Sequence, residues 1–456
     1  MIVPALLLAL STAALQDDKP LLTQDDLLDM VREAMPAVEK ATGRKFRDPV
    51  WARVSHRADV ERALTEELIP QMRILQPEAD PDQARTLAET TSKAFGEILV
   101  AKYAWKRGTI HVIPATIRRI AEALEQPEFL ERSVLRVIVT HELVHALDYQ
   151  EYALFENFGA SKTSTELDIW NALSEGHAQH VTRKVCEAAG DLASFEKYEK
   201  AILSGPPSLG EAERYLANVM SASLKLAYVD GRAFFDALEK SGRKTYVEDV
   251  FRAPPKSKVV ILKPERYYAP PEAAGAGFDP APAFDAFAKD FGADWTRRTQ
   301  ELDPAMLRAS FGAFVDAKKV DEVLDGMLEG RVLVLNPKEA PQSKIVAVAL
   351  IRMRDAEAAK RMEETSIELS KAKDKKMAEG RIRITKAEYA SLPLAGGGSF
   401  TRIRKSMSVQ EQAVEVGSAV GTAGEFEFEL ILSNEEADDA RVTAMVEALL
   451  AGLRKK

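Results

Sequence analysis

The stretch from Leu130 to Tyr149 restricts the fold of this chain most, because it combines the apolar spacing of a packed helix with ionisable side chains. Apolar residues recur there at helical spacing, at Val134, Val137, Ile138 and Val144. The same stretch contains His141 and His145 in the pattern His-Glu-Leu-Val-His. Side chains at positions i and i+4 leave a helix on one face about 6 Å apart, so two imidazoles can bind one tetrahedral Zn²⁺. Glu142 lies one residue further round the helix, where it can act as a general base on water.

A catalytic zinc site needs a third protein ligand and one open position. A histidine six residues beyond His145, with a glycine three beyond it, would complete one known pattern. Glu151 and Asp148 occupy these two positions, so that pattern is excluded. The third ligand must therefore come from another segment.

A second helix is predicted from Thr165 to Ala189, with Ser164 or Thr165 as its N-cap and Gly190 as its stop. It contains Trp-Asn-Ala-Leu-Ser-Glu-Gly-His-Ala-Gln-His-Val, in which Glu175 is the predicted third ligand. Small residues beside this glutamate, Gly176 and Ala178, would let the helix approach the motif helix closely. His177 and His180 are the alternative ligands, although polar roles near the site suit them better. Asp148, two turns beyond His141 on nearly the same helix face, is a candidate to orient the imidazole of His141.

These two segments resemble the gluzincins, zinc metallopeptidases in which H-E-x-x-H is followed by a glutamate on a separate downstream helix. The residues from His141 to Leu147 match the pattern H-E-L-x-H-A-L of secreted bacterial members, and those from Glu175 to Ala178 match E-G-x-A. The resemblance covers about 49–268. It implies a zinc cofactor held by His141, His145 and Glu175, a peptide or protein substrate, and peptide-bond hydrolysis with Glu142 as general base.

The resemblance also implies an α+β fold, in which a small mixed sheet accompanies a helical active-site subdomain. A hairpin turning at Gly108 resembles the one at the edge of the substrate cleft in such enzymes, so its second strand, Thr109 to Ile113, is expected to bind an extended peptide by strand addition. Lys263 stands where these proteins usually carry a histidine. The oxyanion-stabilising residue is therefore left open among Tyr246, Tyr267 and Tyr268.

Composition and residue spacing predict the domain boundaries of the rest of the chain. An apolar run over residues 1–15 resembles a secretory signal peptide, which predicts an exported, periplasmic or extracellular protein with no integral membrane segment after leader removal. A helical segment is expected at 16–48 and the metallopeptidase-like domain at 49–268. A Pro-, Ala- and Gly-rich linker follows at 269–284, and a small α+β domain with an antiparallel sheet at 285–456.

The net charge of −9 and the scattered basic residues argue against nucleic acid as a partner. Cys186 is the single cysteine, so an intramolecular disulfide is excluded. Two other functions compete with the metallopeptidase. One is a non-catalytic extracytoplasmic binding protein on a metallopeptidase scaffold, and the other is a structural module in which the histidine pattern is accidental.

Overall fold

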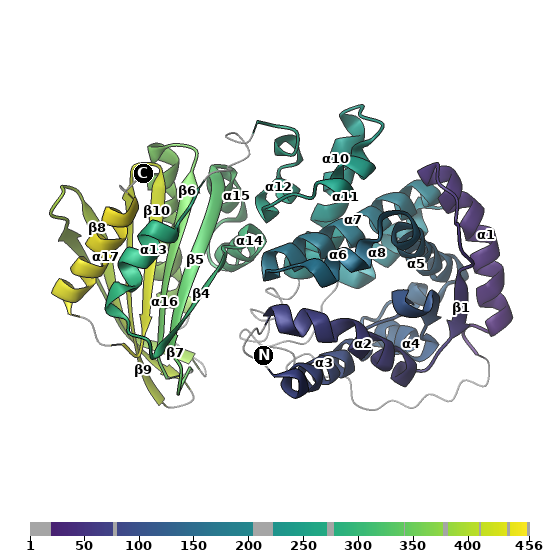
Figure 1. Ribbon diagram of the computed structural model, residues 1–456, viewed down its shortest axis with the longest axis horizontal. Coiled ribbons are helices and arrows are strands. Elements are labelled where there is room, and N and C mark those ends of the chain that lie inside the picture. The colour runs from purple at the N-terminus through teal and green to yellow at the C-terminus, as the bar shows by residue number, and fades with distance from the viewer. Residues whose placement is uncertain are drawn as a thin grey trace. The chain divides into compact units, whose positions relative to one another are not determined.

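Residues 20–75, 80–203, 222–270, 278–341, 343–376, 382–409, 412–435 and 438–453 are described by the computed structural model (Figure 1). The expected leader lies outside these ranges. The chain divides into two units, Met1–Glu265 and Arg266–Lys456, and each is described by itself below. Within the described ranges, every helix is too short or too polar to cross a membrane.

The first unit consists mostly of helices. In chain order its elements are α1 (Gln24–Thr42), β1 (Trp51–Val54), α2 (Arg57–Leu75), α3 (Pro81–Gly96), β2 (Ala101–Ala104), β3 (Thr109–Val112), α4 (Pro114–Ala123), α5 (Arg132–Tyr152), α6 (Leu154–Ala160), α7 (Ser164–Ala188), α8 (Leu192–Leu203), η4 (Leu226–Asp230), α10 (Gly231–Lys240), α11 (Tyr246–Arg252) and α12 (Lys258–Leu262).

The three short strands of this unit form one mixed sheet in the order β1-β3-β2. β1 runs parallel to β3, and β2 runs antiparallel to it. The predicted turn is confirmed: Gly108 has a φ of 58° after the single 3₁₀ turn Trp105–Arg107. The expectation that β3 offers an edge to a peptide is wrong, because β3 is paired on both sides. The two edge strands of this sheet are β1 and β2, and β2 is the edge strand of the hairpin.

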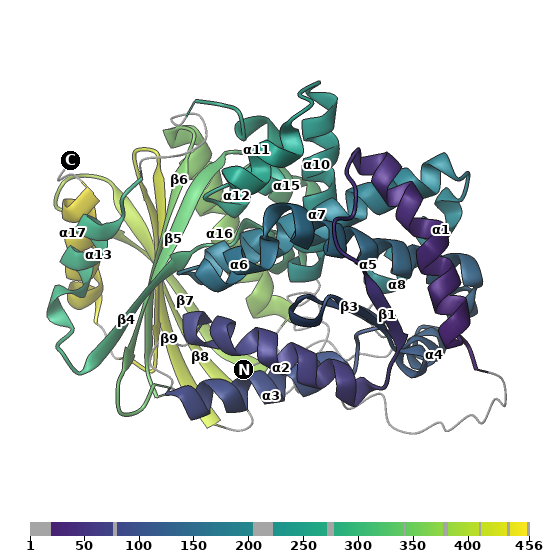
Figure 2. The same ribbon diagram turned by 45° about the vertical axis from the view of Figure 1, so that its right-hand side comes forward.

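Helices α5 and α7 pack against each other at the centre of the unit (Figures 1 and 2). Both predicted helices are confirmed, and Gly190, with a φ of 71°, follows the end of α7. The N-cap of α7 is Thr163 instead of the expected Ser164 or Thr165, and its side chain accepts a hydrogen bond from the Glu166 N–H. Apart from Arg136, α5 is buried on every side from Val134 to Asp148. A helix surrounded by protein exposes no polar face, so its ionisable residues must find partners inside.

The second unit is an α+β structure with a seven-stranded antiparallel sheet in the order β4-β5-β6-β10-β9-β8-β7. Its elements are α13 (Ala281–Phe287), β4 (Trp295–Glu301), α14 (Pro304–Gly312), α15 (Ala317–Asp325), β5 (Met327–Pro337), β6 (Ile345–Met353), α16 (Ala356–Lys376), β7 (Ile382–Pro393), β8 (Ser399–Val409), β9 (Gln412–Ala423), β10 (Phe426–Ser433) and α17 (Asp439–Leu453). The mixed α+β class and the antiparallel sheet are as predicted. α13 occupies the last residues of the stretch expected to be a linker.

The two faces of this sheet have different neighbours, because side chains alternate along each strand. Phe428, Leu430 and Leu432 of β10 share an apolar core with α13 and α17. Glu427 and Glu429 therefore point to the opposite face, which α16 covers. Glu427 is fully buried there, and one of its oxygens accepts a hydrogen bond of 3.2 Å from the Ser366 hydroxyl.

Candidate metal centre

Three predicted ligands meet between α5 and α7. The Nε2 atoms of His141 and His145 lie 3.1 Å apart, and Glu175 Oε2 lies 3.0 Å from the first and 3.4 Å from the second. Both histidines are buried, and the glutamate side chain is 19% exposed. Among the described residues, this is the group whose arrangement can hold a metal ion.

The separations within this group test whether a metal fits. A tetrahedral ion with ligands about 2.0–2.1 Å away has ligand atoms about 3.3 Å from one another. The three measured separations lie within a few tenths of an ångström of that value. Two imidazole nitrogens and one carboxylate oxygen are also the donor set of a catalytic zinc site, which keeps its fourth position open. The residues therefore fit zinc.

The imidazole of His145 and the carboxylate of Glu175 each stabilise the charged form of the other. Burial alone would lower the pKa of His145, but the charge and hydrogen bond of Glu175 raise the pKa above its usual value. Burial would raise the pKa of Glu175, yet the charge of His145 and the hydrogen bonds from both imidazoles hold it well below the usual range. The carboxylate is thus kept ionised, as a metal ligand must be.

The two imidazoles are oriented differently. Ser174, on α7, has its Oγ 3.2 Å from His145 Nδ1, and this hydrogen bond holds the orientation of the His145 ring. The buried Nδ1 of His141 has no partner among the described residues. The idea that Asp148 orients His141 is wrong, because both oxygens of that aspartate contact His177 Nδ1, at 3.0 and 2.8 Å. Asp148 pairs with His177 because the packing of α5 on α7 brings these two side chains together.

The candidate base, Glu142, is held by the edge strand of the small sheet. Its Oε2 accepts a hydrogen bond of 2.5 Å from the backbone N–H of Tyr103 in β2. The neighbouring Lys102 donates to the Tyr103 carbonyl at 3.2 Å and pairs with the buried Glu67 at 2.8 Å. The carboxylate of Glu142 and the ammonium of Lys102 therefore occupy the outward backbone groups of Tyr103.

Two tyrosines that the sequence analysis missed lie close to His141. The rings of Tyr198 and Tyr228 each have their centroid 5.9 Å from the His141 ring, and the Tyr228 ring is nearly parallel to it, at 16°. Burial, with the nearby carboxylates, raises the pKa of both phenols well above the usual value, so both remain protonated donors. Tyr228 lies in the π-helical turn η4, a conformation that often marks functional sites.

Gly176 has a different role from the one predicted. A Cβ atom at this position would lie 2.4 Å from the carbonyl carbon of Gly231, the first residue of α10. The glycine thus admits the helix that follows the π-turn, whereas the fully buried Ala178 belongs to the apolar core that includes α5. Gly176 and Gly231 are both visible in the sequence as glycines of helical segments. Their contact could not be predicted, because it depends on how two separate helices pack.

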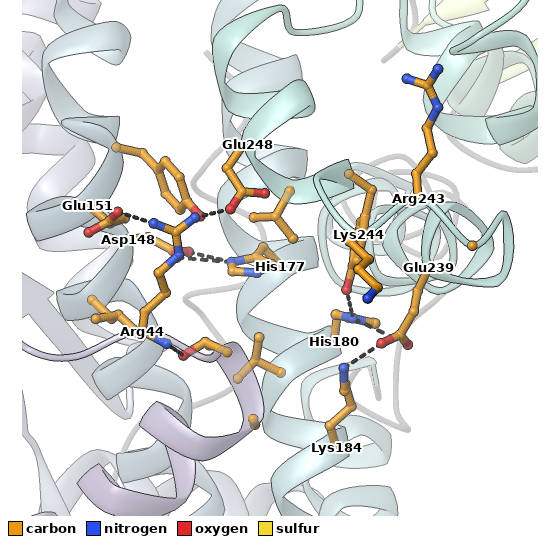
Figure 3. Close-up of a pocket in the computed structure, with 18 residues that line it drawn as sticks. Arg44, Asp148, Glu151, His177, His180, Lys184, Glu239, Arg243, Lys244 and Glu248 are labelled. Atoms are coloured by element: carbon orange, nitrogen blue, oxygen red, sulfur yellow. Dashed lines mark hydrogen bonds and ion pairs between the residues drawn. The ribbon is translucent and has the colours of Figure 1, made fainter.

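The alternative ligands His177 and His180 lie two and five residues beyond Glu175 on α7 and line a separate cavity of about 320 Å³ (Figure 3). His180 Nδ1 lies 2.6 Å from Asp236, and its Nε2 lies 2.9 Å from the Tyr246 hydroxyl. Lys184, which also lines the cavity, donates to Glu239 at 2.5 Å. Each histidine thus has an aspartate partner outside the metal group.

The residues considered for oxyanion stabilisation are distributed elsewhere. Tyr246 bonds His180 beside the cavity. Tyr267 and Tyr268 belong to the second unit, where their rings pack edge to face with centroids 4.7 Å apart. Lys263, where the sequence resemblance predicts a histidine, takes the C-cap of α12.

Comparison with known proteins adds little to this geometry. No family model matches the chain, and no curated protein matches it. One solved structure that is similar in part comes from Chloroflexus aurantiacus and is described as a candidate hydrolase with a novel fold. It is 16% identical, with a TM-score of 0.36, and the match covers 53% of this chain and 88% of the other. The resemblance to gluzincins therefore rests on the residues of the two motifs.

Proposed function

We propose that this protein is a zinc-dependent hydrolase whose reaction is the cleavage of peptide bonds. The observation that carries the proposal is the convergence of His141, His145 and Glu175 at the edge lengths of a zinc tetrahedron. A zinc site with a purely structural role usually has four protein ligands, whereas three ligands beside a buried carboxylate favour catalysis.

Each residue has a distinct task in this reaction. The two imidazoles and Glu175 hold the ion, which when bound acts as a Lewis acid and lowers the pKa of water. Glu142 takes the proton of the attacking water and later delivers it to the leaving amine. The Tyr103 N–H fixes this carboxylate by a bond of 2.5 Å, so little reorganisation is needed when a substrate arrives.

The test combines metal analysis with proteolysis. The purified full chain is analysed for zinc, and cleavage of a peptide library is followed by mass spectrometry. We expect one zinc per chain and metal-dependent cleavage. Glu142→Gln should keep the zinc and lose at least about 100-fold in rate, the usual contribution of a general base. Glu122→Gln, an exposed change on α4, is the matched control and should cleave as the wild type does.

Two results would contradict the proposal. Absence of zinc after reconstitution would remove the metal centre, and equal cleavage by Glu142→Gln would remove the base. Stoichiometric zinc without cleavage of any peptide would favour the second candidate, a non-catalytic binding protein. The observation favouring that candidate is that both outward backbone groups of Tyr103 already have partners, which leaves β2 a poor template for an extended peptide.

A further inference from the structure

The cavity beside α7 is bordered by three hydrogen-bonded side chains that lie outside the metal group (Figure 3). Asp236 Oδ1, on α10, lies 2.6 Å from His180 Nδ1. The Tyr246 hydroxyl, at the start of α11, lies 2.9 Å from His180 Nε2, and both of these residues line the cavity. A carboxylate that orients an imidazole, whose other nitrogen meets a hydroxyl, is the arrangement that activates a hydroxyl as a nucleophile.

The partners of His180 determine which of its nitrogens carries the proton. Arg232 donates to the second oxygen of Asp236 at 3.0 Å, which favours the ionised carboxylate. An ionised carboxylate can only accept, so Nδ1 of His180 carries the hydrogen and Nε2 accepts from the Tyr246 hydroxyl. Glu239 Oε2, 3.8 Å from Nε2, lies beyond hydrogen-bond distance. Burial lowers the pKa of His180 below its usual value, although Asp236 opposes this effect, so the ring is able to take up a proton.

A second tyrosine, Tyr152, lines the same cavity but has different neighbours. Its ring packs on Phe251 with centroids 4.5 Å apart, and the Arg44 guanidinium lies 5.7 Å from its centroid. Burial raises the pKa of both phenols above the ordinary value, so neither ionises by itself at neutral pH. In the described part of the chain, Tyr246 is the tyrosine of this cavity whose hydroxyl bonds an imidazole. Its oxygen can therefore become nucleophilic when His180 takes its proton.

The charges around the cavity favour an uncharged substrate. Four carboxylates and four basic side chains line it. Arg44 pairs with Glu151 and Glu248, and Lys184 pairs with Glu239. Balanced charges give no net attraction to a phosphate dianion, whereas a volume of about 320 Å³ suits a small neutral molecule. An ordinary phenol has a pKa of about 10, so transfer of an acyl group to a tyrosine is not uphill when the departing alcohol is also a phenol. The electrophile that fits best is therefore a small, uncharged aryl ester.

We propose that Tyr246, His180 and Asp236 form a second hydrolytic site, which transfers the acyl group of a small aryl ester to the Tyr246 oxygen and then to water. The Tyr246 oxygen attacks the carbonyl carbon while His180 Nε2 takes the phenolic proton. The bond from that carbon to the leaving oxygen breaks with its electron pair, and His180 gives the proton to the leaving oxygen. Water then attacks the tyrosyl ester, His180 passes a proton from this water to the Tyr246 oxygen, and a carboxylic acid is released. This site is independent of the metal centre.

The test uses the full chain and p-nitrophenyl acetate. Rapid mixing follows the release of p-nitrophenolate, and peptide mass spectrometry after an acid quench locates the acetyl group. We expect a burst of about one p-nitrophenolate per chain, with the acetyl group on Tyr246 and none on Tyr152. Tyr246→Phe should abolish the burst. Tyr389→Phe is the matched control, because the Tyr389 hydroxyl bonds Ser370 and Asp374 in the second unit, and it should give the wild-type burst.

Two variants test the relay behind the tyrosine, and circular dichroism verifies that each is folded. His180→Gln should slow acetylation at least about 100-fold, the usual contribution of a general base. Asp236→Asn keeps the size of the side chain and should also slow acetylation, because the imidazole loses the partner that sets its tautomer. An unlabelled Tyr246, equal labelling of Tyr152, or a wild-type rate in both variants would overturn the inference.

A zinc chelator separates this site from the metal centre. Acetylation of Tyr246 should be the same before and after zinc is removed from the folded chain. If chelation abolishes p-nitrophenolate release and Tyr246 carries no acetyl group, ester cleavage belongs to the metal centre, which overturns this inference and leaves the proposed function standing. If peptide cleavage is absent while Tyr246 is acetylated as expected, the proposed function fails and this inference is upheld.

Discussion

Substitution of Gly176 by alanine should destabilise the first unit measurably. The added Cβ would lie 2.4 Å from Gly231 C and 2.6 Å from Gly231 Cα, whereas carbon atoms in contact lie about 3.5–4.0 Å apart. The obstructing atoms belong to the backbone, so α10 must shift by about 1 Å. Overpacking of this kind costs about 1–3 kcal/mol. The higher helix propensity of alanine offsets up to about 1 kcal/mol. A net loss of about 1–2 kcal/mol lowers Tm by roughly 2–8 °C for a unit of this size.

Thermal unfolding monitored by circular dichroism measures this change. Gly159→Ala is the matched control, because Gly159 is an exposed helical glycine whose added Cβ would have no described atom within 4 Å. The control should leave Tm unchanged or raise it, through a gain of up to about 1 kcal/mol. If Gly176→Ala melts at or above the wild-type temperature, the close crossing of α7 and α10 is refuted.

Two further changes test other parts of the chain. Burial, with the neighbouring Glu429, raises the pKa of Glu427 well above its usual value, so its stabilising contribution is present at low pH and is lost as pH rises through the raised pKa. Glu427→Gln should therefore stabilise the second unit at alkaline pH by on the order of 1 kcal/mol and flatten the dependence of stability on pH, as denaturant titrations at several pH values would measure. An equal effect of the exposed control Glu364→Gln would contradict this reasoning. Ser174→Ala removes the partner of His145 Nδ1 and should weaken zinc binding about 10-fold, as competition with a chromogenic chelator would measure. Unchanged affinity would show that packing alone orients the ring.

The group of candidate metal ligands was predictable because backbone geometry fixes the relation between its members. Two histidines four residues apart on a helix must share a face, and a glutamate on a second buried helix needs only that the two helices pack together. The structure brings His141, His145 and Glu175 together as expected. The role of Glu142 stays a prediction.

Other features depend on contacts between distant segments. Tyr228 was missed because a π-turn changes the side-chain direction that regular helical spacing would give. The edge of the small sheet was assigned wrongly because β1, far earlier in the chain, pairs with β3. In the second unit, β7 and β8 were not predicted, because charged residues interrupt the apolar alternation that marks a strand.

The hydrogen bond from Tyr103 to Glu142 has a consequence for how this chain can change over evolutionary time. The donor is a main-chain amide, so it survives replacement of the Tyr103 side chain by any residue other than proline. Substitutions at position 103 can change the side chain next to the Glu142 carboxylate while the hydrogen bond to that carboxylate is kept. The side chains around Glu142 can therefore change in a lineage without loss of the hydrogen bond that holds its carboxylate.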